Sequence, residues 1–163
     1  MKRFFLFLIA ALITFGTAIA KDPEVTEVAL VGEGVGNGGR PIVLVTCAAK
    51  KADKVTDQDI RRCALRGILF RGYADKSNTT SYDASTSHPA LLTPDQEAGH
   101  ADYFNDFFAN DAYNAYVDII PDNRKVMKAG KVYHVTQAVQ VNVPGLRKKL
   151  EKDGIIRSLK SGW

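Results

Sequence analysis

The chain has 163 residues and a formal net charge of +4, from 22 Lys and Arg against 18 Asp and Glu. The basic residues are scattered along the sequence, so no strongly basic face is indicated and we exclude nucleic acid as a partner. The length is typical of one domain with a single hydrophobic core.

Residues 1–20 have the pattern of a secretory signal peptide. Lys2 and Arg3 precede an apolar run over residues 4–15, and Ala18-Ile19-Ala20 supplies the small residues of a cleavage site. The run is too short for a membrane-spanning helix, which needs about 20 residues. No cysteine stands directly at the cleavage site, so we expect no lipid anchor, and no second apolar run follows, so we expect no transmembrane segment. The predicted location is the periplasm or the outside of a Gram-negative cell.

Two cysteines, Cys47 and Cys63, enter that oxidising compartment, where a disulfide is chemically permitted. If residues 41–49 form a strand and residues 57–71 a helix that folds back over it, the two sulfur atoms can meet. A bridge across this span would stabilise the fold by about 3 kcal/mol. Two buried free thiols are the equal alternative.

A β-hairpin is predicted near the start of the domain. Residues 28–35 and 41–49 are β-branched apolar runs separated by Gly36-Asn37-Gly38-Gly39, and Asn-Gly between such runs favours a tight antiparallel turn. These glycines also match the dinucleotide fingerprint G-x-G-x-x-G, but a strand follows them where that motif needs a helix. We therefore expect no cofactor there. Thr56 then has the character of an N-cap for a helix that ends near Arg71.

The middle of the chain predicts a loop and a second helix. Residues 74–92 are polar and without periodicity, which indicates a long surface loop. Thr93-Pro94-Asp95-Gln96 combines an N-cap hydroxyl, proline at the first helical position and a capping-box glutamine, and the helix should end near Ala109.

Two alternating strands and a helix complete the prediction, over residues 113–119, 133–143 and 144–154. The order is ββααββα. Residues 21–163 should form one α+β domain, a two-layer sandwich in which three helices cover one face of a four-stranded, mostly antiparallel sheet.

Candidate catalytic and metal-binding residues do not converge within this pattern. His100, Asp102 and Asp106 lie on one predicted helix, but their spacing does not place them on one face, so we expect no metal site there. No serine stands in a nucleophile-elbow motif. A site assembled from distant segments around His88, His100 or His134 stays open as the alternative, a secreted hydrolase or metal-dependent enzyme.

Three segments resemble small secreted proteins of Bacteroidetes that have no assigned function. They are DIRRCALRGILFRGY from Asp59, HADYFNDFFAND from His100, and residues 131–163. The order of one helix, two long strands and a final Leu-x-x-x-Leu helix is more remotely similar to α/β domains of bacterial envelope lipoproteins and of the N-terminal region of the flagellar assembly protein T. This resemblance implies an envelope or secreted protein with an assembly role and supplies no catalytic residue.

The predicted function is binding of another envelope or secreted protein, without catalysis and without a cofactor. The candidate surface combines the 74–92 loop with the polar face of the sheet. Self-association through the sheet is a further alternative. The residues expected at the surface are Tyr82, Tyr116, His134, Thr136 and Gln140.

Overall fold

The structure is a computed structural model that describes residues 25–76 and 87–157. Within these ranges one mixed sheet has the strand order β4-β3-β1-β2-β7-β5, and β6 also pairs with β7. The strands are β1 Val25–Val35, β2 Pro41–Ala49, β3 Tyr73–Asp75, β4 Ser87–His88, β5 Val117–Ile119, β6 Lys125–Ala129 and β7 Val132–Val141. The helices are α1 Asp57–Phe70, α2 Pro94–Gly99, α3 Ala101–Ala109 and α4 Val143–Lys152, with short 3-10 turns η1 Asn37–Gly39, η2 Ala52–Lys54 and η3 Ala112–Tyr116.

The predicted four-stranded, mostly antiparallel sheet with three helices is wrong, although the protein is α+β. The described residues form a seven-stranded open mixed sheet and four α-helices. Part of the predicted 74–92 loop forms β3 and β4, and β3 pairs in parallel with β1. The five residues of β6 are all exposed and were not predicted as a strand. These short strands bury few apolar side chains, so the sequence has no periodic signal for them.

Two further elements differ from the prediction in the second half of the chain. The helix predicted up to Ala109 breaks at His100, whose φ of −123° and ψ of 28° end α2 before α3 begins. The strand predicted over residues 113–119 begins as η3, and only Val117–Ile119 is extended. The apolar side chains are still used, because Tyr113 is fully buried and Val117 almost so.

The elements with strong local signals were predicted correctly. β1 and β2 form the antiparallel hairpin, and Gly38 in its turn has a positive φ of 68°. Thr56 and Thr93 each form a capping box, in which the threonine side chain accepts a hydrogen bond from the backbone three residues on.

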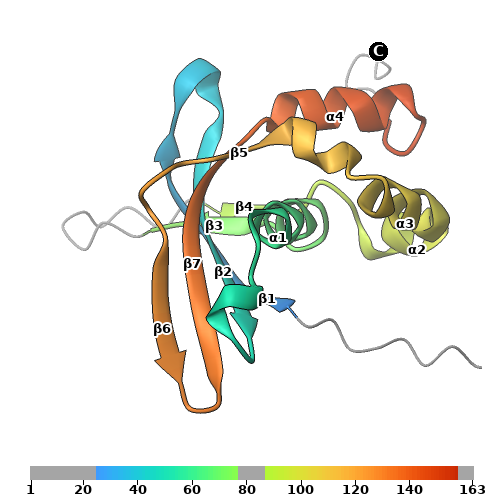
Figure 1. Cartoon of the computed structure of the whole chain (residues 1–163). Coiled ribbons are helices and arrows are strands. Elements are labelled where there is room, and N and C mark those ends of the chain that lie inside the picture. Colours follow the sequence, from blue (N-terminus) through green and yellow to red (C-terminus); the bar gives the residue numbers. More distant parts are fainter. Residues whose placement is uncertain (1–24, 77–86, 158–163) are drawn as a thin grey trace, which may run out of the picture.

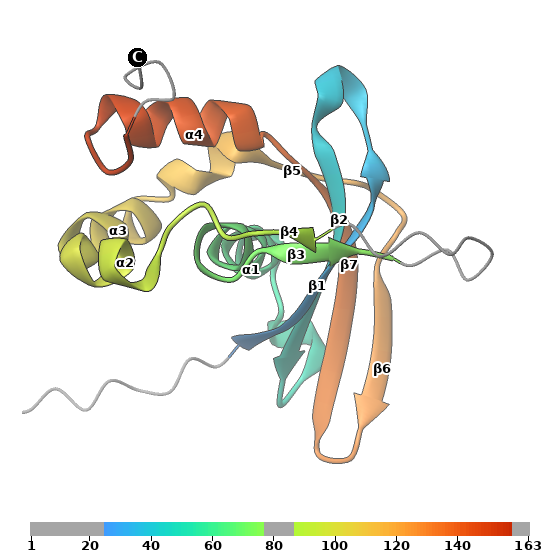
Figure 2. The same ribbon diagram turned by 180° about the vertical axis from the view of Figure 1, so that it is seen from behind.

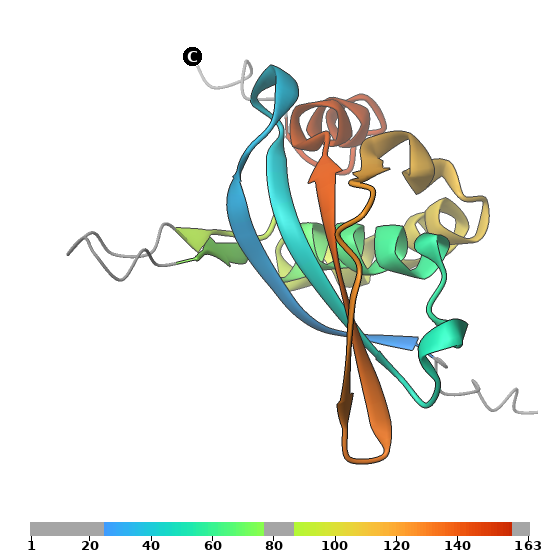
Figure 3. The ribbon, with the colours of Figure 1, turned by 60° about the vertical axis from the view of Figure 1, so that its left-hand side comes forward.

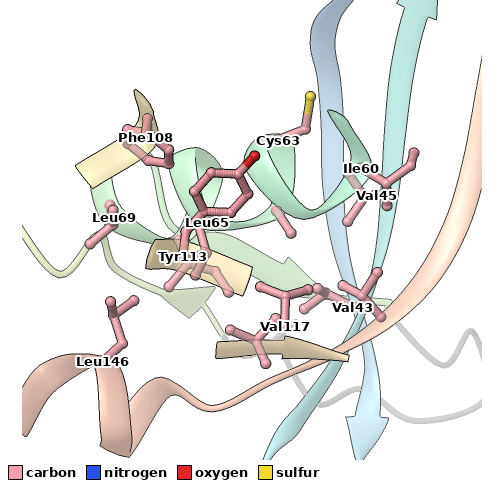
Figure 4. Packing of buried hydrophobic residues seen from close by; sticks show 14 of the residues in the cluster. Val43, Val45, Ile60, Cys63, Leu65, Leu69, Phe108, Tyr113, Val117 and Leu146 are labelled. Atoms are coloured by element: carbon pink, nitrogen blue, oxygen red, sulfur yellow. The ribbon is translucent and has the colours of Figure 1, made fainter. Parts of the chain in front are cut away.

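The helices lie together on one side of the sheet (Figure 1). The α1 helix lies next to the strands, α3 lies outside α1, and α4 lies at the end of the molecule where β7 finishes (Figure 1). From behind, β3 and β4 are seen beside α1 (Figure 2), at the β1 edge of the sheet. The core fills the space between sheet and helices, as Val43, Leu65 and Leu146 illustrate (Figure 4).

The signal peptide predicted at residues 1–20 lies outside the described residues. In the part of the chain that the structure describes, no helix has the length and apolar character required to cross a membrane.

Candidate functional site

The face of the sheet that points away from the helices is the candidate site. In β2, the residues that alternate with the buried Val43, Val45 and Cys47 are half-buried and point to the opposite side, since successive strand residues face opposite ways. The strand register then assigns residues of the neighbouring strands to the same side. We call this surface the outer face; it comprises Thr26, Ala29, Val31, Ile42, Leu44, Thr46, Ala48, Lys125, Met127, His134, Thr136, Ala138 and Gln140.

The middle of the outer face is apolar, with Val31 and Leu44 half-buried and Ala138 only 2% exposed. Leu44 of β2 lies between Val31 of β1 and Ala138 of β7 in one row across three strands. In the next row, the hydroxyl oxygens of Thr46 and Thr136 are 2.9 Å apart and form a hydrogen bond. One hydroxyl donates to the other, so the accepting hydroxyl keeps its own O–H for another acceptor, and this row has a polar centre.

One end of the outer face is held by polar contacts. The Gln140 side chain donates a hydrogen bond to the Asn37 carbonyl oxygen in the hairpin turn, at 2.8 Å. Arg40 and Asp118 form an ion pair of 3.4 Å nearby, in which the Asp118 side chain is 71% exposed. An ion pair this exposed contributes little to stability, so both groups can exchange partners.

The other end of the outer face is basic. Lys125 and Met127 of β6 lie beside Thr136 and His134 of β7, and Met127 is 64% exposed. The β6–β7 hairpin extends beyond the helix layer (Figure 3). The chain contains no Asp or Glu from Asn123 to Leu150. Among the described residues, no carboxylate lies within ion-pair distance of the three lysines of this hairpin, Lys125, Lys128 and Lys131.

Three of the five predicted surface residues lie together. His134, Thr136 and Gln140 occupy the same side of β7. Tyr116 does not join them, because it belongs to η3 on the helix side, where its ring centroid is 6.3 Å from that of Phe107. Tyr82 lies outside the described residues.

The contributions of β6 and of the apolar middle row to this face could not be predicted from the sequence. The run without carboxylates from Asn123 to Leu150 was the one sequence signal for the basic hairpin. Leu44 belongs to a strand with apolar residues on both sides, a pattern typical of an interior strand, so the sequence gives no sign that one side is a surface.

The three histidines lie on separate elements. His88 in β4 is 3.1 Å from Asp75 of β3 and stacks on Tyr73, with ring centroids 4.3 Å apart. His134 is on the outer face, and His100 is at the break between α2 and α3. Within residues 25–76 and 87–157, no group of three or more His, Cys, Asp and Glu side chains could hold a metal ion.

Both cysteines are buried free thiols that lie next to each other. A hydrogen bond to Cys63, together with burial, raises the pKa of the Cys47 thiol. Cys63 also lines a cavity of about 370 Å³ with Glu27 and three arginines. The structure contains the two cysteines as free thiols. A disulfide between them stays a prediction, which their adjacent positions allow.

Comparison of the chain with family models, curated proteins and solved structures gives no match.

Proposed function

We propose that this protein is an exported, non-catalytic domain that binds another envelope or secreted protein through its outer face. The carrying observation is the arrangement of that face: the half-buried Val31 and Leu44 lie at its middle, the Thr46–Thr136 pair lies beside them, and the exposed Met127 and Lys125 lie at one end. Protein interfaces have this composition, with an apolar centre and a polar rim.

The charge of the face favours a partner that presents carboxylates beside an apolar patch. Lys125 lies on the outer face itself, whereas Lys128 points to the other side of β6, over the Tyr133 ring, and Lys131 lies in the turn, so the positive charge gathers at the tip of the β6–β7 hairpin. Two copies of the chain that met through β6 would bring their hairpin lysines close together, and repulsion between like charges is destabilising. Complementary charge instead speeds the association of an acidic partner and selects it over others.

Site-specific photo-crosslinking in the intact envelope of the producing cell tests the proposal. A benzophenone amino acid is placed at Thr46 or Thr136 on the outer face, and at the exposed Lys148 of α4 as the control. We expect one discrete adduct, shared by positions 46 and 136 and missing at position 148. Lys125→Glu combined with Lys128→Glu should abolish that adduct, because these changes reverse the charge of β6, whereas Lys148→Glu should leave it intact.

Three outcomes would contradict the proposal. Adducts of equal yield at all three positions would indicate non-specific contact. An adduct of twice the mass of the chain would show self-association in place of a heterologous partner. If no adduct formed at Thr46 or at Thr136, the outer face would not be the surface that binds a partner.

Export is tested separately, by the mass of the mature product. The full-length precursor, expressed in a Gram-negative host, should yield a soluble periplasmic or secreted chain that begins at Lys21. Recovery of the intact precursor in the cytoplasm would refute this part of the proposal.

A further inference from the structure

An apolar pocket of about 450 Å³ lies away from the outer-face residues, between the β1–β2 turn, β3–β4 and the start of α4. Its apolar wall includes Pro41, Ile68, Leu91 and Val143. The volume falls within the range of small-molecule sites, which are mostly apolar and carry a few polar groups.

Backbone contacts hold one wall of this pocket in place. The amides of Leu91 and Leu92 donate hydrogen bonds to the carbonyls of Ile68 and Leu69 at the end of α1, at 3.1 and 3.0 Å. A Cβ on Gly72 would lie 2.2 Å from the His88 carbonyl oxygen, so the two backbones are in close contact. The wall is therefore preformed, which lowers the entropy lost when a ligand binds.

The polar groups of the pocket are cationic or neutral. Arg147 and His88 line it, and no carboxylate among the described residues does. The Arg147 Nε donates a hydrogen bond to Glu151 at 3.2 Å. Among the described residues, no other hydrogen bond uses a donor of the Arg147 side chain. A guanidinium has five N–H donors, so the others can reach an anion. His88 and Tyr73, stacked with an interplanar angle of 19°, add a flat aromatic wall.

We propose that the pocket binds a small amphipathic organic anion, with an apolar body against the β1–β2 turn and α1 and one acidic group at Arg147. The apolar lining selects the body of the ligand. The free donors of the arginine select its charge.

Two fluorescent probes that differ by one charge test this assignment on the mature chain. One is 8-anilinonaphthalene-1-sulfonate and the other is N-phenyl-1-naphthylamine, which is the same molecule without the sulfonate. Arg147→Gln should weaken binding of the sulfonate about tenfold, the loss expected for one charge-assisted hydrogen bond, and leave binding of the neutral amine unchanged. Arg147→Lys should recover part of the sulfonate affinity. Lys148→Gln, one residue along α4 and exposed, should change neither.

A second variant tests the pocket independently of charge. Ala90→Trp places a large ring in the lining, and a folded A90W chain should lose both probes. Equal effects of Arg147→Gln and Lys148→Gln on the sulfonate would overturn the proposal. So would failure of both probes to bind the wild-type chain below about 1 mM.

Discussion

Glu27 is a carboxylate in a confined position at the edge of the core. Its side chain is 7% exposed, and a Cβ on Gly67 of α1 would lie 3.0 Å from its Oε1. Arg71 lies 3.4 Å away. Desolvation raises the pKa of Glu27, and the opposing charges of Arg71 and Arg66 do not offset it. The folded protein therefore holds a proton on Glu27 more strongly than the unfolded chain does.

Glu27→Gln should raise the free energy of unfolding at pH 7 by a fraction of a kcal/mol. A raised pKa means that the folded state binds more protons above the ordinary value of 4.5, so wild-type stability falls as the pH rises through this window and stays lower at pH 7. Glutamine does not ionise, so the variant keeps the stability that the wild type loses when Glu27 gives up its proton. Urea denaturation at several pH values measures the difference, which should shrink as the pH falls below 4.5.

The matched control is Glu33→Gln, at a carboxylate of the same strand that is 34% exposed and paired with Lys76. It should change stability little at any pH. If E27Q is less stable than wild type at pH 7, the ion pair with Arg71 outweighs desolvation, and burial does not destabilise the Glu27 carboxylate.

The thiols of Cys47 and Cys63 should form a disulfide under mild oxidation, since they are adjacent. Cys47 is fully buried, whereas Cys63 lines the cavity that holds Arg62, Arg66 and Arg71. Oxidised glutathione should therefore react first at Cys63, and Cys47 should then displace glutathione. Mass spectrometry should find the Cys47–Cys63 linked peptide in the wild type, and stable glutathione on Cys63 in Cys47→Ala. Two free thiols after oxidation would contradict the predicted pairing.

Two glycines next to helices differ in what a side chain would meet. Gly72, just after α1, has a φ of +77°, and an added Cβ would lie 2.2 Å from the His88 carbonyl oxygen. Gly99, at the end of α2, does not have a positive φ, and an added Cβ would meet nothing within 4 Å. The first glycine is required by close backbone contact, and the second is not.

Alanine at these two positions should have opposite effects on stability. Gly72→Ala should lower the free energy of unfolding by about 2 kcal/mol or more, because it adds left-handed backbone strain to a backbone collision. Gly99→Ala should raise it by about 0.5 kcal/mol, because it restricts only the unfolded chain. Thermal denaturation of both variants measures this. A destabilised G99A would mean that the break between α2 and α3 requires glycine.

Elements with local signals could be predicted from the sequence, and elements made by tertiary pairing could not. The turn at Asn37-Gly38 and the caps at Thr56 and Thr93 depend on residues within three positions of each other. β3 exists because Ala74 pairs with Val31, more than 40 residues away in the sequence. β6 exists because β7 offers it an edge, and its exposed residues give no apolar alternation.

The same distinction applies to the candidate site. Alternation along β7 placed His134, Thr136 and Gln140 on one side, and the register confirms that they share it. Tyr116 followed the same alternation in the sequence, but the chain there is helical and its ring packs near Phe107. The 3-10 turn buries Tyr113 just as a strand would have done, so the apolar pattern alone did not distinguish the two.

At the scale of the whole molecule, one apolar cluster connects the sheet with the helices. It includes Val43 and Val139 from the sheet, Leu65 from α1, Phe107 from α3 and Leu146 from α4. Polar contacts add to it: the Tyr103 hydroxyl of α3 donates to Asp153 after α4, at 2.6 Å. Because the central strands β2 and β7 and the helices α1, α3 and α4 all contribute to this cluster, we expect sheet and helices to unfold in one cooperative step.

Leu146→Ala should reveal that cooperativity. Leu146 is fully buried, so its truncation should lower the free energy of unfolding by about 2–5 kcal/mol. Native-state hydrogen exchange should show the same loss for amides of β2, on the far side of the core, as for amides of α4. Lys148→Ala, an exposed change on the same helix, should affect neither. If L146A reduced protection in α4 alone, the helix would open independently of the sheet, and the Arg147 pocket would not be a rigid preformed site.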